Sequence, residues 1–147
     1  MAGADGDSGS RTAGSGSDSS LDEPARRRVL VADDETAIRS LITTFLTRAG
    51  YDVAHAEDGQ EAIDLLQSGS YDAVVTDLMM PRVDGVGVVR YIQKNHPELL
   101  SRTIVLTAYP RLAESESIEK LCSVIAKPFE LANLRGVLKS MFDDVQS

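Results

Sequence analysis

The sequence predicts an α/β fold in which a parallel sheet of five strands carries helices on both faces. From Arg26 onward, short runs of β-branched and apolar residues alternate with segments whose apolar residues recur at helical spacing. Strands that alternate with helices in this way form parallel sheets. The chain has 147 residues, the length of about one domain, and it contains no internal repeat beyond this unit.

The five expected strands lie at 29–32, 51–54, 73–76, 103–106 and 123–126. The first, third and fourth runs are apolar nearly throughout, as in strands that are buried on both faces of a sheet. The second run alternates between polar and apolar residues, which indicates an edge strand.

Five amphipathic helices are expected at about 38–49, 58–66, 84–95, 113–120 and 131–142. Gly50 provides a C-cap for the first helix, and the second opens with the capping box Asp58-Gly59-Gln60-Glu61. Pro97 stops the third. The fourth is expected to be short, because it has little apolar face.

The first 25 residues are expected to be a disordered tail, and residues 26–147 to form the folded domain. Residues 1–20 hold almost only Gly, Ser, Ala and Asp, too little apolar surface to offset the entropy of ordering. The tail lacks the apolar middle of a signal peptide, and no run approaches the ~18 apolar residues of a membrane span. We therefore expect a cytoplasmic protein with no membrane partner.

Charge and cysteine content exclude several functions. The formal net charge is −8, and an acidic chain offers no basic footprint for nucleic acid, so none is expected as a partner. A single cysteine, Cys122, excludes an internal disulfide and any multi-cysteine metal site. We expect Cys122 to be a small packing residue.

Polar side chains end four of the expected strands. The first strand is followed by Asp33-Asp34-Glu35, the third by Asp77, the fourth by Thr107 and the fifth by Lys127. Ligands of open parallel sheets bind beyond the carboxyl ends of the strands, so these groups should converge on one edge.

Each of these residues also has a simpler explanation. Asp33 or Asp34 could cap the first helix, although a cap needs only one of them. Thr107 and Lys127, taken alone, could be an ordinary strand-end threonine and an exposed lysine. Asp77 is harder to explain in this way, because Leu78-Met79-Met80 follow it and argue against free solvation. The joint placement of these residues therefore favours a functional site.

Three clustered carboxylates repel one another unless a cation is present. Mg²⁺ fits such a cluster, since it prefers oxygen ligands and binds through one or two carboxylates plus phosphate oxygens. A carboxylate beside Mg²⁺, a lysine and a hydroxyl is equipped to attack phosphorus and to become an acyl phosphate. The sequence therefore predicts aspartyl phosphorylation.

The motifs VLVADDE, DLMMPRVDG, IVLTA and AKPF, in this order and at these strand ends, resemble the receiver domain of two-component response regulators, of the kind found in chemotaxis regulators. The resemblance covers about residues 28–141. It implies a flavodoxin-like, doubly wound sheet of order 2-1-3-4-5. Val124 departs from the family, which often carries an aromatic residue three positions before the lysine.

The resemblance also implies roles for the residues at the strand ends. Asp77 would be the phosphoacceptor. Asp34 would bind Mg²⁺ directly, Asp33 would bind it largely through water, and Met79 would offer its backbone carbonyl.

Two further roles concern the phosphoryl group and the switch. Lys127 would pair with phosphoryl oxygens, and Thr107 would move to hydrogen-bond them, shifting its loop and the face made by the fourth helix and fifth strand. The phosphoryl group would come from a phosphohistidine of a sensor histidine kinase or a phosphotransfer protein. The switched face would control a downstream partner protein whose identity the sequence leaves open.

Three other functions fit these residues less well. A Mg²⁺-dependent phosphohydrolase commonly places D-x-D after the first strand, and Asp33-Asp34-Glu35 does not provide it. A flavin- or nucleotide-binding module would need a Gly/Ser/Thr-rich loop at that place. A receiver-like protein that works without phosphorylation would not need all five site residues. We therefore expect that the protein catalyses its own phosphorylation and dephosphorylation and is otherwise not an enzyme.

The sequence leaves the wider architecture open. No DNA-binding or enzymatic output is expected after the fifth helix. Both a stand-alone receiver and the receiver portion of a larger protein, such as a hybrid kinase, fit the residues.

Overall fold

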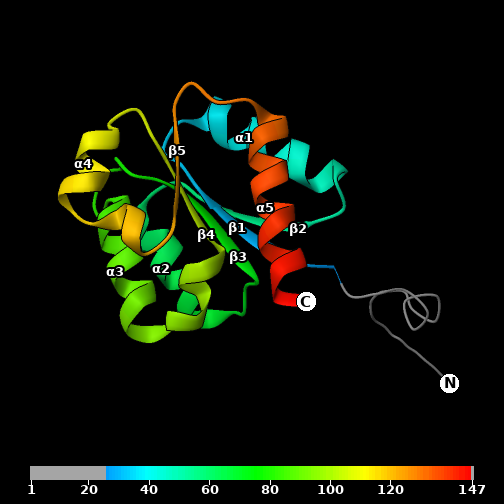
Figure 1. Ribbon diagram of the computed structural model, residues 1–147, viewed down its shortest axis with the longest axis horizontal. Helices are drawn as coiled ribbons and strands as arrows, with labels where there is room; N and C mark the ends of the chain where they lie inside the picture. The colour runs from blue at the N-terminus through cyan, green and yellow to red at the C-terminus, as the bar shows by residue number, and fades with distance from the viewer. Residues whose placement is uncertain (1–25, 147) are drawn as a thin grey trace, which may run out of the picture.

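The computed structural model describes residues 26–146. Its core is a five-stranded parallel sheet of order β2-β1-β3-β4-β5, as predicted (Figure 1). The strands are β1 (Arg28–Ala32), β2 (Asp52–Ala56), β3 (Ala73–Asp77), β4 (Thr103–Thr107) and β5 (Ser123–Ala126). The tail predicted for residues 1–25 lies outside the described residues.

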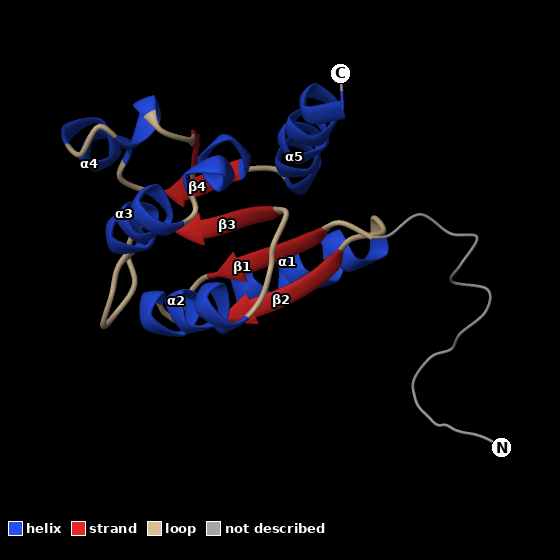
Figure 2. Ribbon diagram, turned by 90° about the horizontal axis from the view of Figure 1, so that it is seen from below, coloured by secondary structure: helices blue, strands red, loops and turns tan. Residues whose placement is uncertain are grey.

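The sheet separates two layers of helices (Figure 2). The helices α1 (Thr36–Arg48) and α5 (Leu131–Gln146) cover one face, and α2 (Gly59–Ser68) and α3 (Gly85–Asn95) cover the other together with α4 (Pro110–Ser115). Alternation along β1 explains the division. Val29 and Val31 pack with α1 and α5, whereas Leu30 and Ala32 pack with α2 and α3.

The central strands are buried throughout. Every residue of β3 and β4 is buried, including Thr76, Asp77 and Thr107. β2 is only partly buried, with Asp52 and His55 exposed, and it forms one edge of the sheet, as its sequence pattern indicates. Strands buried in this way are rigid supports, so the groups at their carboxyl ends are held by packing on both sides.

The helix ends follow the local sequence signals with one shift. Asp58 is the N-cap of α2, and its carboxylate accepts a hydrogen bond from the Glu61 N–H at 2.8 Å. The Glu61 carboxylate accepts from the Glu57 N–H at 2.7 Å, one residue before its expected partner. Gly50, with φ of +104°, follows the α1 C-cap residue Ala49 in the left-handed region that glycine adopts without strain.

The fourth helix differs from the expected range of 113–120. Pro110, whose fixed φ favours the first turn, starts α4 three residues earlier, and the helix ends at Ser115. Ser117 then adopts a left-handed conformation with φ of 59° and separates α4 from a short 3-10 helix, Ile118–Lys120. A second 3-10 helix, Pro97–Arg102, precedes β4 and was not predicted.

The two ends of the described chain meet at the amino edge of the sheet (Figure 1). The Arg27 guanidinium lies 4.9 Å from the centroid of the Phe142 ring, and the Tyr51 ring lies 5.9 Å from the same ring. Among the helices described here, none has the length and apolar character needed to cross a bilayer.

Candidate functional site

Three aspartates meet at the carboxyl edge of the sheet. Asp33 and Asp34 directly follow β1, and Asp77 is the last residue of the neighbouring strand β3. One carboxylate oxygen of each lies within 4.8 Å of the other two. Asp33 and Asp77 are only 1% and 7% exposed, whereas Asp34 is exposed. The cluster is therefore walled on the protein side and open on one side to solvent.

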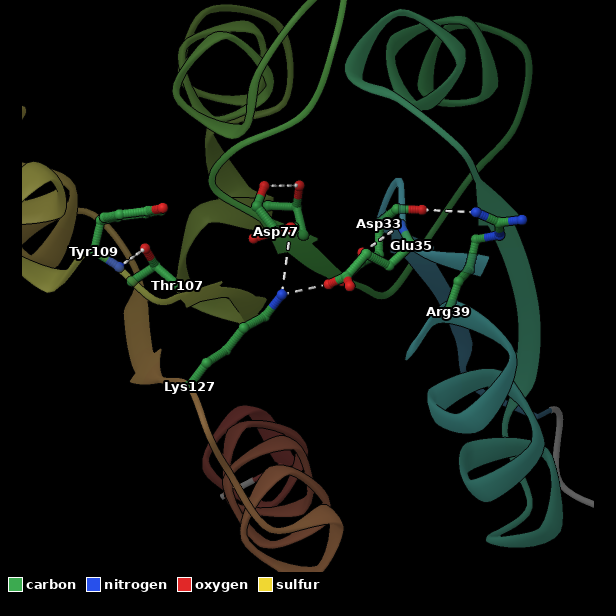
Figure 3. Close-up of polar contacts among 8 residues, drawn as sticks. Asp33, Glu35, Arg39, Asp77, Thr107, Tyr109 and Lys127 are labelled. Carbon is green, nitrogen blue, oxygen red and sulfur yellow. Dashed lines mark hydrogen bonds and ion pairs between the residues drawn. The ribbon is translucent and has the colours of Figure 1, made fainter. Parts of the chain in front are cut away.

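Asp33 is held by three hydrogen bonds to neighbouring protein groups. Its N–H donates to the Ala56 carbonyl at 3.1 Å, and its Oδ1 accepts from the Glu35 N–H at 2.9 Å. Its carbonyl accepts from the Arg39 guanidinium at 2.8 Å (Figure 3). These bonds fix both the backbone and the side chain where β1 passes into α1.

Lys127, the residue after β5, contacts two of the three aspartates. Its Nζ lies 3.3 Å from Asp77 Oδ2 and 3.5 Å from Asp33 Oδ2 (Figure 3). Its N–H donates to the Thr107 carbonyl at 2.8 Å, which places the lysine beside the end of β4. One ammonium group thus bridges the two buried carboxylates of the cluster.

Burial and charge shift the pKa values in this cluster. Burial, and then the Asp33 carboxylate, raise the pKa of Asp77 above its usual value, and Lys127 offsets only part of this. Burial would lower the pKa of Lys127, but the two carboxylates together raise it. An additional cation would relieve the crowding of negative charge that raises the pKa of Asp77.

The donor set fits a hard divalent cation. Three carboxylates converge, two of them buried, and neither His nor Cys contributes to the cluster. Oxygen ligands with an open side are what Mg²⁺ requires, because it keeps several waters and dehydrates reluctantly. Asp33, Asp34 and Asp77 are therefore the residues that could hold such an ion.

Thr107 lies at the end of β4 and is fully buried. Its Oγ1 accepts a hydrogen bond from the Tyr109 N–H at 2.7 Å (Figure 3). The hydroxyl therefore has a local partner and closes the turn that leads into α4. Tyr109 and Met79, each two residues beyond a strand-end polar group, are 58% and 46% exposed.

Sequence reasoning missed Arg39, whose contact with the Asp33 carbonyl supports the acidic cluster from behind. The available signal was weak: an arginine on the helix that begins directly after the acidic pair. Basic residues on helices are common, so nothing in the pattern distinguished this one from a solvated side chain.

Comparison with known proteins identifies the family. The model of the response regulator receiver domain matches residues 29–139. The response regulator MprA of Mycolicibacterium vanbaalenii is 39% identical over 118 residues, which cover 78% of this chain and 49% of that protein. A probable transcriptional regulator, ycf27, of Guillardia theta is 37% identical over 81% of this chain and 48% of its own length. The chain thus spans about half the length of these curated relatives.

Solved structures agree. The receiver domain of the Francisella response regulator 1452 superimposes with a TM-score of 0.73 and 30% identity, over 82% of this chain and 99% of that one. The response regulator TrrA of Thermotoga maritima, solved in complex with Mg²⁺-BeF, superimposes with a TM-score of 0.71 and 34% sequence identity. The match covers 78% of this chain and 98% of that one. The chain belongs to the response regulator receiver domain family, as its motifs predicted.

Proposed function

We propose that residues 26–147 accept a phosphoryl group on Asp77 and act as a phosphorylation switch in a two-component phosphorelay. The observation that carries the proposal is the convergence of Asp33, Asp34, Asp77 and Lys127 at the strand ends. The donor is a phosphohistidine of a sensor histidine kinase or phosphotransfer protein. The chain catalyses its own phosphorylation and dephosphorylation and no other reaction.

The transfer replaces a P–N bond by a P–O bond. A carboxylate oxygen of Asp77 attacks phosphorus in line with the departing imidazole, which leaves with the electron pair and takes up a proton from solvent. The result is an acyl phosphate. The Lys127 ammonium, 3.3 Å from Asp77, is placed to pair with phosphoryl oxygens as their charge grows.

Asp33, Asp34 and Asp77, with the Met79 backbone carbonyl, would hold Mg²⁺. The ion, when bound, would neutralise charge on the carboxylates and phosphoryl oxygens. The related TrrA was solved with Mg²⁺-BeF, which supports this choice of metal. Asp33, buried and already bonded to the Glu35 N–H, fits contact through water, and the exposed Asp34 fits direct contact.

Thr107 couples the site to a surface that a partner protein can recognise. Once a phosphoryl oxygen is available, the hydroxyl turns toward it and gives up the bond from the Tyr109 N–H. The turn into α4 then changes, and with it the face made by α4 and β5. The small side chain of Val124 on β5 means that this movement does not depend on an aromatic partner at that position. We place this function in the cytoplasm.

Phosphorylation is tested by incubating the protein with Mg²⁺ and acetyl phosphate and measuring its intact mass. One added phosphoryl group is expected, and none for Asp77→Asn. Asp64→Asn is the matched control, because Asp64 is an exposed aspartate on α2 whose carboxylate, among residues 26–146, accepts a hydrogen bond only from Gln60. A phosphoryl group that survives in Asp77→Asn would refute the assignment of the phosphoacceptor.

The switch is tested separately with Thr107→Ala. We expect this variant to gain the phosphoryl group as the native chain does, since Asp77 and Lys127 are unchanged. The amide resonances of Tyr109–Ser115 should shift on beryllofluoride binding in the native chain and remain in place in the variant. Equal shifts in both proteins would rule out the Thr107 route.

A further inference from the structure

A carboxylate–guanidinium pair joins the start of α2 to the loop that follows the phosphoacceptor. Arg82 Nε donates to Asp58 Oδ2 at 2.9 Å, and Arg82 Nη2 donates to Asp58 Oδ1 at 3.0 Å. The same Oδ1 accepts from the Glu61 N–H at 2.8 Å, as the helix cap. The pair is therefore bidentate, and its acid is itself fixed by the helix.

The backbone at Arg82 requires such support. Arg82 has a φ of 66°, in the left-handed region that non-glycine residues adopt at a cost. Its neighbour Val83 packs directly against α2, because a Cβ on Gly59 would collide with the Val83 carbonyl. The loop thus has two attachments to the start of α2, one polar and one by close packing.

The same loop carries the backbone of the proposed metal site. It leaves β3 at Asp77, and the Leu78 N–H donates to the Leu106 carbonyl at 3.0 Å. It closes where the Gly85 N–H donates to the Leu78 carbonyl at 2.8 Å. Met79 therefore lies between Leu78, which takes part in both of these hydrogen bonds, and Arg82, which pairs with Asp58 at the start of α2.

We propose that Asp58 and Arg82 are positioning residues for the Mg²⁺ site, acting through the loop that carries the Met79 carbonyl. The inference rests on the proposed function and adds two residues to it. Neither side chain belongs to the acidic cluster. Among the described residues, the two side chains hydrogen-bond to each other, and Asp58 also accepts from the Glu61 N–H at the start of α2. Their effect must therefore pass through the loop backbone.

Charge and positioning predict opposite results for one substitution. Arg82→Gln removes a positive charge from an acidic molecule, so long-range electrostatics alone would make Mg²⁺ bind more tightly. Loss of positioning would make Mg²⁺ bind more weakly. Arg90→Gln is the matched control, because Arg90 also forms an exposed ion pair, with Glu116, that does not touch this loop.

Mg²⁺ affinity is measured by titration of the native chain, Arg82→Gln, Asp58→Asn, the double variant and Arg90→Gln. The chain has no tryptophan, so amide resonances of Met79 and Met80 serve as the signal, at low ionic strength to limit screening. We expect each single variant to bind about fivefold more weakly, the most that an exposed pair normally contributes. The double variant should lose little more, because both changes break one contact.

Two further measurements separate positioning from loss of stability. In metal-free protein, the amide of Gly85 should exchange with solvent faster in Arg82→Gln than in Arg90→Gln. Arg82→Gly breaks the pair at a φ that suits glycine, so the thermal midpoint should be retained while Mg²⁺ binding weakens. Saturating Mg²⁺ should restore the rate of phosphorylation by acetyl phosphate in every variant.

The outcomes are distinct. If the native chain binds Mg²⁺ and Arg82→Gln binds it as Arg90→Gln does, the positioning role is wrong and the proposed function stands. If the native chain binds no Mg²⁺ at millimolar concentration, both fall. Weakened binding in Asp58→Asn and Arg82→Gln, with faster exchange at Gly85, supports the role.

Discussion

The environment of Asp77 opposes ionisation of its carboxyl group. Burial at the end of β3 and the charge of Asp33 both disfavour its ionised form, and a single ammonium, Lys127, compensates in part. The same surroundings suit the role that we propose for the group, since a poorly solvated carboxylate responds strongly to a cation or a phosphoryl group. Stability and the proposed function are therefore opposed at this residue.

Asp77→Asn should stabilise the metal-free protein at neutral pH. The pKa of Asp77 in the folded chain is raised above its ordinary value of 3.8. Below that value both states hold the proton and no cost arises. As the pH rises from 3.8 through the raised pKa the cost develops, and above it the cost is complete. The variant lacks this cost, so its free energy of unfolding should be higher by about 0.5–2 kcal/mol at pH 7.

Urea unfolding of both proteins between pH 4 and 8, without divalent cations, measures this gain. The difference between them should shrink toward pH 4. Added Mg²⁺ should stabilise the native chain more than the variant, because it binds only the folded state. A gain that stays constant with pH would show that charge is not its cause.

Cys122 should be unreactive in the folded chain. Burial raises the pKa of its thiol to about 12, from the usual 9.0. Since the thiolate is the nucleophile, its amount at pH 8 falls by about 10³ on folding. Alkylation by iodoacetamide should therefore be slow in buffer and fast in 8 M urea. Rapid alkylation of the native chain would show that the Ile118–Cys122 segment opens.

At the scale of elements, two glycines in helices have opposite roles. A Cβ on Gly85, the first residue of α3, would collide with backbone atoms of Asp77 and Leu78. A Cβ on Gly136, within α5, would meet nothing within 4 Å. The first glycine lets α3 begin close to the end of β3, whereas the second only weakens its helix.

Gly85→Ala should therefore destabilise the fold, by about 1–3 kcal/mol, since backbone must move to admit the methyl group. The same movement should impair phosphorylation of Asp77. Gly136→Ala should stabilise by about 0.5–1 kcal/mol, the difference in helix propensity. Chemical unfolding of both variants, with the acetyl phosphate assay, tests the contrast. Equal effects would contradict the packing around Gly85.

At the scale of the whole molecule, the acidic cluster lies at the carboxyl ends of the strands, and the two ends of the described chain lie at the amino ends. The acidic cluster and Lys127 lie beyond the carboxyl ends of β1, β3 and β5. Arg27 and Phe142 meet beyond the amino end of β1. The five-stranded core therefore separates the acidic cluster from the described ends.

Removal of residues 1–25 should leave the domain intact. The segment adds few apolar side chains, and our proposed domain begins at residue 26. The shortened chain should unfold at the same urea concentration within error and accept a phosphoryl group at the same rate. A lower midpoint would show that the segment contributes to the folded state.

The first, third and fourth strands could be predicted because their sequences are apolar on both faces. The run at 73–76 is buried throughout, as its composition requires. The second strand was less well placed: its expected range was 51–54, but pairing with β1 brings His55 and Ala56 beside Val31 and Ala32. Register depends on the partner strand, which a local pattern does not contain.

For the site, the residues at the strand ends could be predicted, but the side-chain contacts around them could not. The rule that ligands bind beyond the carboxyl ends of strands predicted, from the sequence alone, that Asp33, Asp77 and Lys127 converge. It could not give the Arg39 contact, nor the pairing of Asp58 with Arg82 over 24 residues. Those contacts depend on side-chain conformation and on how α2 packs beside α3, not on any spacing in the chain.

The adjacency of the two described ends has a practical consequence for spectroscopy. Fluorophores attached near Arg26 and Asp143 would lie close together in the folded chain, on the side away from the acidic cluster, because Arg27 stacks on Phe142. Energy transfer between them would be high while the domain is folded and would fall when it unfolds. Such a labelled chain reports folding alone, so stability and phosphorylation could be followed in one sample by separate signals.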